Sequence, residues 1–276
     1  MRKTMRLNGI ISLEGVGLHS GKLCCLTIEP YDSPDIVMRS GHEEAPLRVL
    51  RTNGTNRGSD YTFPGGTVIR TCEHVLSALA GLGVYDGVRV TVDGGEMPAL
   101  DGCAETLCRE IMTHSHDDGH EVPSLNVSRP VIVATDDRTR FVAAFPDDGL
   151  HITYTVEYEN AGTQILDYAH SPENYAVNIA PARTFAYERD IEYLRSHGMA
   201  LGGSLDNAIL IGKTIQAKGG LRWENEFVRH KVLDLIGDLA SLGRPLNAHI
   251  IAVRAGHELH LRLAEKLKED LQSWQK

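Results

Sequence analysis

One stretch of the sequence places imidazole and carboxylate side chains at the spacing of a helical turn. His230, Asp234 and Asp238 follow one another at intervals of four residues within the segment 227–242. Because four residues turn an α-helix by about 400°, these side chains drift only about 40° per step and share one face. An imidazole and a carboxylate one turn apart can bind the same metal ion. The alternative is a solvated polar stripe opposite the apolar face of the helix.

Glu73 and His74 offer further groups for a hydrolytic metal site. They precede the apolar stretch 75–80, so we expect both near the start of a helix. Neighbouring helical residues point about 100° apart and are poorly placed to bind one ion together. We therefore predict His74 as a ligand and Glu73 as the general base that takes a proton from the activated water. The alternative is an acid favoured by the helix dipole beside a packed imidazole.

Together, His74, His230 and Asp234 form a set of two imidazoles and one carboxylate. Three protein ligands leave a position open for water or substrate, which is typical of catalytic zinc sites, and iron(II) suits the same donors. His257 lies in a predicted loop after the last strand and could protonate a leaving group. The five cysteines are odd in number and form no CxxC pair, so we interpret them as reduced packing thiols.

Two other patterns are not interpreted as sites. The segment 14–22 contains three glycines and a lysine, but its spacing fits neither the Walker nor the dinucleotide-binding pattern, and it predicts a tight turn that carries His19. The His- and Asp-rich tract 114–120 lies in a polar linker where nothing preorganises the side chains. It indicates adventitious metal affinity at most.

The composition of the whole chain narrows the function classes. Of 276 residues, 42% are hydrophobic, 24% charged and 6% aromatic, which predicts a globular protein with one large core or two smaller ones. The formal net charge of −9 argues against a broad nucleic-acid surface, so we expect no nucleic-acid partner. No apolar run approaches the roughly 20 residues of a membrane span, and residues 1–3 lead into polar sequence, so we expect a cytoplasmic protein.

The elements that must position these residues form two halves, each with strands first and helices later. A polar stretch at 113–124 separates the halves, and we predict domains at 1–121 and 125–276. This order favours an α+β fold in which helices cover one side of each sheet. Strands are predicted at 22–28, 46–50, 87–92, 131–134, 140–145, 150–158, 208–211 and 247–253, and helices at 72–82, 104–114, 190–197, 226–242 and 259–274.

The chain resembles a known family, the zinc-dependent UDP-3-O-acyl-N-acetylglucosamine deacetylases of lipid A biosynthesis. The motifs that carry the resemblance lie in the same order and span nearly the whole chain. They are GVGLHSGK at 15–22, TCEHVLSALAGLG at 71–83, ARTF at 182–185, RDIEYL at 189–194, LGGSLD at 201–206, FVRHKVLDLIGD at 227–238 and AGH at 255–257. So many co-linear matches are not explained by coincidence.

The resemblance implies two similar α+β domains packed face to face around a central zinc cleft. It implies a metal-dependent amidohydrolase that removes the acetyl group from UDP-3-O-(3-hydroxyacyl)-N-acetylglucosamine, the committed step of lipid A synthesis. It implies that His74, His230 and Asp234 bind the metal and that Glu73 is the base. It also implies that His257 is a general acid that Asp238 orients. Thr184 would stabilise the oxyanion, and Lys231 would lie beside the reacting centre.

The resemblance also implies where the substrate lies. An insert at about 187–223 would form an apolar passage for the acyl chain, with core packing as the alternative for its apolar residues. Those residues are Ile191, Leu194, Met199, Leu201 and Ile209. The nucleotide would lie toward the other end of the cleft. The expected substrate contacts are His19, Tyr158, Phe185, Ile191, Leu194, Gly203, Ser204 and Lys231.

Two alternatives stay open. The segment 159–162 stands where the family commonly has a His-Pro pair, which favours a paralogue that deacetylates a different acylated amino sugar or nucleotide. The second alternative is a non-catalytic module that binds nucleotide sugars. The presence of Glu73 and His257 argues against it, because a module that only binds needs neither residue. We expect a monomer that comes transiently close to the inner membrane surface, where it meets its acylated substrate.

Overall fold

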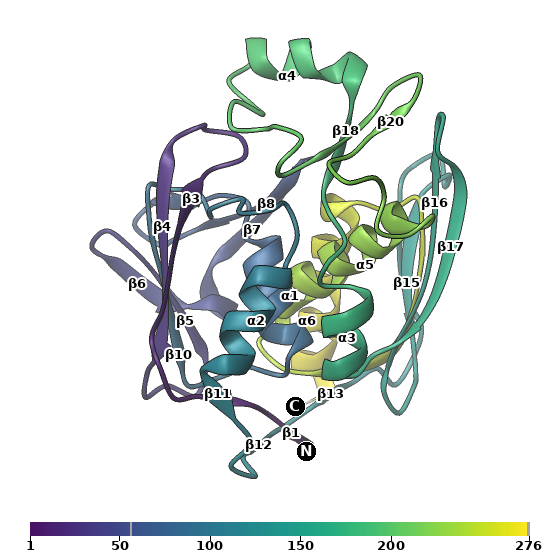
Figure 1. Ribbon diagram of the computed structural model, residues 1–276. Coiled ribbons are helices and arrows are strands. Elements are labelled where there is room, and N and C mark those ends of the chain that lie inside the picture. The colour runs from purple at the N-terminus through teal and green to yellow at the C-terminus, as the bar shows by residue number, and fades with distance from the viewer. Residues whose placement is uncertain (56, 275–276) are drawn as a thin grey trace.

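Two β-sheets form opposite outer sides of the molecule, and helices pack between them (Figure 1). The computed structural model describes residues 1–55 and 57–274. Each sheet is covered by helices on its inner side, so the predicted α+β fold class is confirmed. Within the described residues, no helix combines the length and the apolar character that a membrane crossing requires.

The sheet of the N-terminal half has five strands, and its inner face is apolar. In chain order they are β3 (Ile11–Val16), β4 (Leu23–Pro30), β5 (Ile36–Ser40), β6 (Glu43–Pro46) and β10 (Val88–Asp93). Their order in the sheet is β3-β4-β10-β5-β6, and only β10 and β5 run parallel. Cys24, Leu26 and Ile28 alternate with more exposed residues along β4, which is the pattern of a sheet with one covered face.

The sheet of the C-terminal half is built around a central strand whose alternate residues are buried. Its strands are β13 (Leu125–Asn126), β14 (Val131–Ala134), β15 (Phe141–Phe145), β16 (Leu150–Tyr158), β17 (Gly162–Ala169) and β21 (Leu246–Val253). β21 pairs with β15 and β16 on its two sides, and alternate residues of β21 are buried. An inward-facing residue of β16 or β21 therefore meets the helices of the middle layer.

Five helices form the middle layer. They are α1 (Glu73–Gly81), α2 (Glu105–Thr113), α3 (Pro172–Asn178), α5 (Glu226–Leu239) and α6 (His257–Trp274). Every residue of α1 is buried, and every residue of α5 except Arg229 and Lys231 is buried. The histidine and carboxylates of α5 are therefore not a solvated stripe, because both faces of this helix are covered by protein.

A separate small sheet carries the segment between α3 and α5. It consists of β18 (Phe185–Tyr187), β19 (Ile209–Ile211) and β20 (Ile215–Gln216), with η2 (Glu188–Asp190) and α4 (Ile191–Ser196) between its first two strands. In Figure 1 this unit stands at the top of the molecule, above the middle layer. It coincides with most of the insert that the sequence predicts.

The stretch expected to be a linker is ordered. It contains β11 (Ser115–His116) and β12 (Glu121–Val122), which pair with β2 (Arg6–Leu7) and β1 (Arg2–Lys3). One continuous hydrophobic core includes residues of both halves. The division into domains at 1–121 and 125–276 stays a prediction.

Several local predictions were wrong or missing. The residues predicted as a strand at 46–50 mostly form η1 (Leu47–Val49), a 3-10 turn that buries Leu47. The hairpin of β7 (Arg51–Thr55), β8 (Gly58–Thr62) and β9 (Val68–Ile69) was not predicted. His257 begins α6 and is buried, whereas the sequence placed it in a loop.

Candidate active site

The first turn of α1 lies directly against α5. A Cβ atom added to Gly237 would stand 2.0 Å from the carbonyl oxygen of Glu73, so only glycine permits this approach. The contact brings the two residues that begin α1 next to the polar side chains of α5. Residues that are about 160 positions apart in the chain thereby share one buried site.

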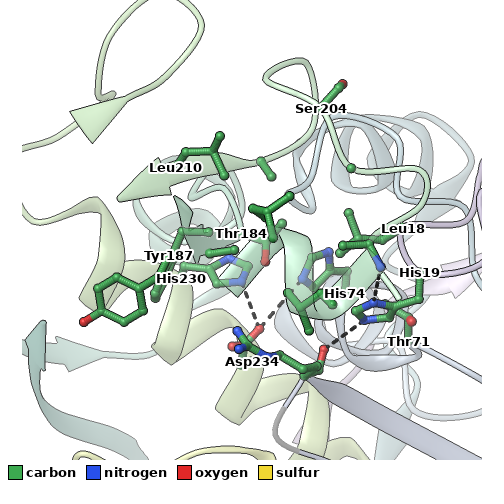
Figure 2. Close-up of a pocket in the computed structure, with 18 of the residues that line it drawn as sticks. Leu18, His19, Thr71, His74, Thr184, Tyr187, Ser204, Leu210, His230 and Asp234 are labelled. Atoms are coloured by element: carbon green, nitrogen blue, oxygen red, sulfur yellow. Dashed lines mark hydrogen bonds and ion pairs between the residues drawn. The ribbon is translucent and has the colours of Figure 1, made fainter. Parts of the chain in front are cut away.

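Two histidines meet one oxygen of Asp234. Nε2 of His230 lies 3.3 Å from Oδ1 of Asp234, and Nε2 of His74 lies 3.8 Å from the same oxygen. Figure 2 shows both rings directed at this carboxylate from different elements. The three ligand atoms all lie within 4.8 Å of one another. Among the described residues, none donates a hydrogen bond to this buried Oδ1.

The protonation states around Asp234 suit a cation. Burial lowers the pKa of His230, and burial together with His230 lowers the pKa of His74 to about 3, so both rings are neutral at pH 7. Nδ1 of His230 donates to the carbonyl of Ala182 at 3.0 Å, which leaves the lone pair on Nε2. An unpartnered carboxylate oxygen beside two imidazole lone pairs fits a divalent metal ion.

Lys231 holds the other oxygen of Asp234. Its Nζ donates to Oδ2 at 2.6 Å. Burial alone would raise the pKa of Asp234, but His230 and Lys231 outweigh it and hold that pKa well below its ordinary value. Burial would likewise lower the pKa of Lys231, but the Asp234 carboxylate outweighs it and raises that pKa. The carboxylate is therefore ionised, and its orientation is fixed.

Glu73 is a buried carboxyl group at the edge of this site. Its Oε2 accepts the backbone N–H of Ser59 at 2.9 Å. Chiefly through burial, with Asp234 adding to the effect, the pKa of Glu73 rises to about 7 even though His257 opposes the shift. A carboxyl group that titrates near pH 7 can take up and release a proton at that pH. A side chain at Gly58 would crowd Glu73, because its Cβ would lie 3.0 Å from Oε1.

His257 and Asp238 form a second buried pair. Nδ1 of His257 donates to Oδ2 of Asp238 at 2.9 Å, and Nε2 of His257 lies 3.6 Å from Oδ2 of Asp234. Burial alone would lower the pKa of His257, but Asp238 and Asp234 outweigh it and raise the pKa to about 9. His257 is therefore a cation that can donate a proton. The hydroxyl of Ser59 donates to Oδ1 of Asp238.

A cavity of about 460 Å³ opens over these groups. Thr184, Phe185 and Tyr158 form one side of it, and the Phe185 ring centre lies 5.8 Å from that of His230. All the proposed catalytic and metal-binding residues except Asp238 line this cavity. Asp238 lies behind His257, where it touches the ring and not the cavity.

The wall contributed by the insert is mostly apolar, with Arg195 as its charged member. Ile191 and Leu194 of α4 line the cavity, together with Ala208 and Leu210. The prediction was wrong for the other three apolar residues. Ile209 points to the opposite face of β19 and packs in a small core with Phe227, and Leu201 is 51% exposed. Met199 is not among the lining residues.

The turn that carries His19 is joined to the insert. Nδ1 of His19 accepts the N–H of Ala200 at 3.4 Å, and the Leu201 N–H donates to the His19 carbonyl at 3.1 Å. Nε2 of His19 lies 3.2 Å from the carbonyl oxygen of Arg57. His19 and Ser204 line the cavity (Figure 2), and so does Gly203. His19 therefore connects its own turn to the insert through hydrogen bonds, and it also lines the cavity.

Two polar residues of the site were not singled out from the sequence. Ser59 lies in the unpredicted hairpin and contacts both Glu73 and Asp238. The buried Glu96 accepts the backbone N–H groups of His19 and Ser20 at 2.8 Å each. Neither residue lies in a periodic pattern that indicates a site, because each acts on residues far away in the sequence.

Comparison with known proteins gives consistent matches over nearly the whole chain. Residues 4–269 match the family model described as UDP-3-O-acyl N-acetylglycosamine deacetylase. Three curated relatives are named UDP-3-O-acyl-N-acetylglucosamine deacetylase, and each is 37% identical to this chain. The protein from Oleidesulfovibrio alaskensis aligns over 91% of this chain and 84% of its own length. The corresponding shares are 95% and 93% for Chlamydia muridarum, and 93% and 95% for Nostoc sp..

Proposed function

Because the chain belongs to the UDP-3-O-acyl-N-acetylglucosamine deacetylase family, we propose that the cavity over α1 and α5 is its active site. The protein is a hydrolase that removes the acetyl group from UDP-3-O-acyl-N-acetylglucosamine in lipid A biosynthesis. The observation that carries the placement of the reaction is the buried oxygen of Asp234 between two imidazole nitrogens.

We assign the metal site to His74, His230 and Asp234. The ligand atoms would be the two Nε2 atoms and Oδ1. This donor set suits zinc(II), which we propose as the cofactor, and iron(II) is the other candidate. A divalent cation held there supplies Lewis-acid polarisation of water and of the amide carbonyl.

Glu73 acts as the general base. The Ser59 N–H fixes Oε2, and we assign the transfer of the proton from the attacking water to Oε1. The raised pKa of about 7 makes the proton transferable in both directions. Burial of the carboxyl group beside the ligand set keeps it within reach of a water in the cavity.

His257 acts as the general acid. Its cationic ring donates the proton on Nε2 to the departing amine, while Nδ1 stays bound to Asp238. The Thr184 hydroxyl donates a hydrogen bond to the oxyanion that forms when water attacks the amide. Lys231 keeps Asp234 ionised and adds positive charge beside the cavity.

The two parts of the substrate require different surroundings. We place the acyl chain along the apolar wall of the insert, where Ile191, Leu194 and Leu210 line the cavity. We place the nucleotide toward Tyr158, Lys231 and His19, where polar atoms border it. Phe185, Gly203 and Ser204 also line the cavity and are proposed sugar contacts.

We further propose a cytoplasmic monomer that approaches the inner membrane surface only to meet its acylated substrate.

The central test measures acetate release from UDP-3-O-(3-hydroxyacyl)-N-acetylglucosamine, with and without a chelator. The wild type should release acetate and bind about one zinc per chain, and chelation should stop turnover. Glu73→Gln should retain the metal and lose nearly all activity, because the amide cannot accept the proton. His249→Gln, on the far face of the second sheet, is the matched control. Full activity of Glu73→Gln would remove this residue from the mechanism.

A further inference from the structure

Two buried side chains outside the assigned catalytic set reach the carboxylate that orients His257. Nδ1 of His260 lies 2.7 Å from Oδ2 of Asp238, and the Tyr154 hydroxyl lies 2.9 Å from Nε2 of His260. Both His260 and Tyr154 are completely buried. No step of the proposed reaction uses either residue, yet both are connected to the group that holds the acid.

Three hydrogen bonds fix the orientation of the Asp238 carboxylate. Its Oδ2 accepts hydrogen bonds from Nδ1 of His257 at 2.9 Å and from Nδ1 of His260 at 2.7 Å. Its Oδ1 accepts the hydroxyl of Ser59. Two ring nitrogens at hydrogen-bond distance from one oxygen indicate a hydrogen-bonded cluster, not a second metal site. A carboxylate only accepts, so each Nδ1 carries a hydrogen.

Tyr154 connects this cluster to the start of α6. It lies on β16, and its hydroxyl is 3.0 Å from the carbonyl oxygen of Ala255, two residues before His257. Its ring meets the His260 ring edge-on, with centres 5.9 Å apart. One phenol therefore touches both the ring that supports Asp238 and the backbone that leads into His257.

The cluster is not a path for protons to solvent. The contacts run from His257 through Asp238 and His260 to Tyr154, and they end on a main-chain carbonyl, which does not relay a proton. Because His260 and Tyr154 are completely buried, neither exchanges protons directly with bulk water. A geometric role remains, in which the cluster holds the ring of His257.

We propose that His260 and Tyr154 are positioning residues of the deacetylation: acting through Asp238 and the start of α6, they hold the His257 ring where it protonates the leaving amine. This inference rests on the proposed function and deepens it. Partners that orient a catalytic group are themselves needed for full activity.

A pair of amide variants tests the proposal. His260→Asn places its amide nitrogen near the position of Nδ1 and can still donate to Asp238, whereas His260→Gln places it near Nε2 and cannot. His260→Asn keeps the Asp238 contact but loses the Tyr154 contact, so we expect its kcat to fall by less than about 10-fold. We expect kcat of His260→Gln to fall about 10- to 100-fold, with KM nearly unchanged in both. Equal losses in the two variants would overturn the proposal.

Tyr154→Phe tests the outer member of the cluster. It keeps the ring and removes only the hydroxyl, so we expect kcat to fall about 3- to 10-fold without loss of bound metal. Tyr168→Phe is the matched control, because Tyr168 is a buried tyrosine on the adjacent β17 whose hydroxyl contacts His170 at 3.1 Å. Equal kcat values for Tyr154→Phe and the wild type would exclude Tyr154 from this role.

A second measurement does not depend on turnover. Nitrogen-15 labelling of the histidines should show ring N–H signals from Nδ1 of both His257 and His260. His260→Asn should remove one signal and leave the His257 signal in place, whereas His260→Gln should shift the His257 signal. An unshifted His257 signal in His260→Gln would contradict the positioning role. A wild type that releases no acetate would instead refute the proposed function, and the spectra would still test the cluster.

Discussion

The two oxygens of Asp234 have different neighbours, and this difference organises the site at the scale of single residues. Oδ1 faces the two imidazoles, while Oδ2 is bound by Lys231. The spacing of His230 and Asp234 predicted that these side chains share a helix face, and the structure places them together. Lys231 stands three residues before Asp234, a spacing that permits contact on a helix, but the sequence alone does not show that it binds the oxygen opposite the two histidines.

Thr184 offers a direct test at this scale. Removing its hydroxyl in Thr184→Val should lower kcat about 100-fold with little change in KM, because the oxyanion loses a hydrogen bond that it makes only in the transition state. Thr184→Ser keeps the hydroxyl and should retain most of the activity. Steady-state kinetics on the two variants measures the effect. Equal activity of the valine and serine variants would remove Thr184 from the oxyanion site.

Glu96 should make stability depend on pH. Burial alone would raise its pKa, but hydrogen bonds from Ser20 and His19 outweigh it and lower the pKa below the ordinary 4.5. A carboxyl group with a lowered folded-state pKa stabilises the fold above its unfolded pKa and loses that effect as the pH falls through the folded pKa. Glu96→Gln should therefore lower the free energy of unfolding by about 1 to 3 kcal/mol at pH 7.

Urea unfolding at several pH values checks this expectation for Glu96. The difference between wild type and Glu96→Gln should narrow below about pH 5, because the wild-type carboxylate is then progressively protonated. Glu121→Gln, an exposed residue of β12, is the control and should change stability little at any pH. A difference between wild type and Glu96→Gln that is constant with pH would contradict the ionic role of Glu96.

At the scale of elements, the close approach of α1 and α5 sets the geometry of the site. Gly237→Ala would place a Cβ atom 2.0 Å from the Glu73 carbonyl, so the two helices must separate. We expect a loss of roughly 2 to 4 kcal/mol of stability together with weaker metal binding, as for other overpacked buried positions. Gly149→Ala is the control, since its nearest contact would be 3.9 Å. Thermal unfolding and metal titration measure both effects.

Most long elements could be predicted from the sequence, because their patterns are local. The alternation in β4 and the apolar stretch of α1 are examples. The hairpin that carries Ser59 was missed because its strands are short and polar. Tyr154 was not singled out because an inward-facing aromatic residue of a strand has the pattern of an ordinary core residue, and its contact with His260 is visible only in three dimensions.

At the scale of the whole molecule, the proposed metal site joins the two halves. His74 comes from the N-terminal half, and His230 and Asp234 come from the C-terminal half. A metal bound only by the folded protein should raise the melting temperature, by a free energy of about 2.7 kcal/mol when the free ion is at 100 times its dissociation constant. Calorimetry with and without a chelator checks this. His230→Ala should melt at the same temperature in both conditions.

The burial of nearly all of α5 limits which substitutions this helix can accept. Of its residues, Arg229 and Lys231 alone escape full burial, and the helix also carries two of the proposed ligands. A random substitution in this helix therefore either disturbs tightly packed neighbours or removes a proposed metal ligand. A library of codon changes assayed for deacetylation should therefore retain few substitutions along this helix, and a compound that contacts its side chains would leave few routes to resistance.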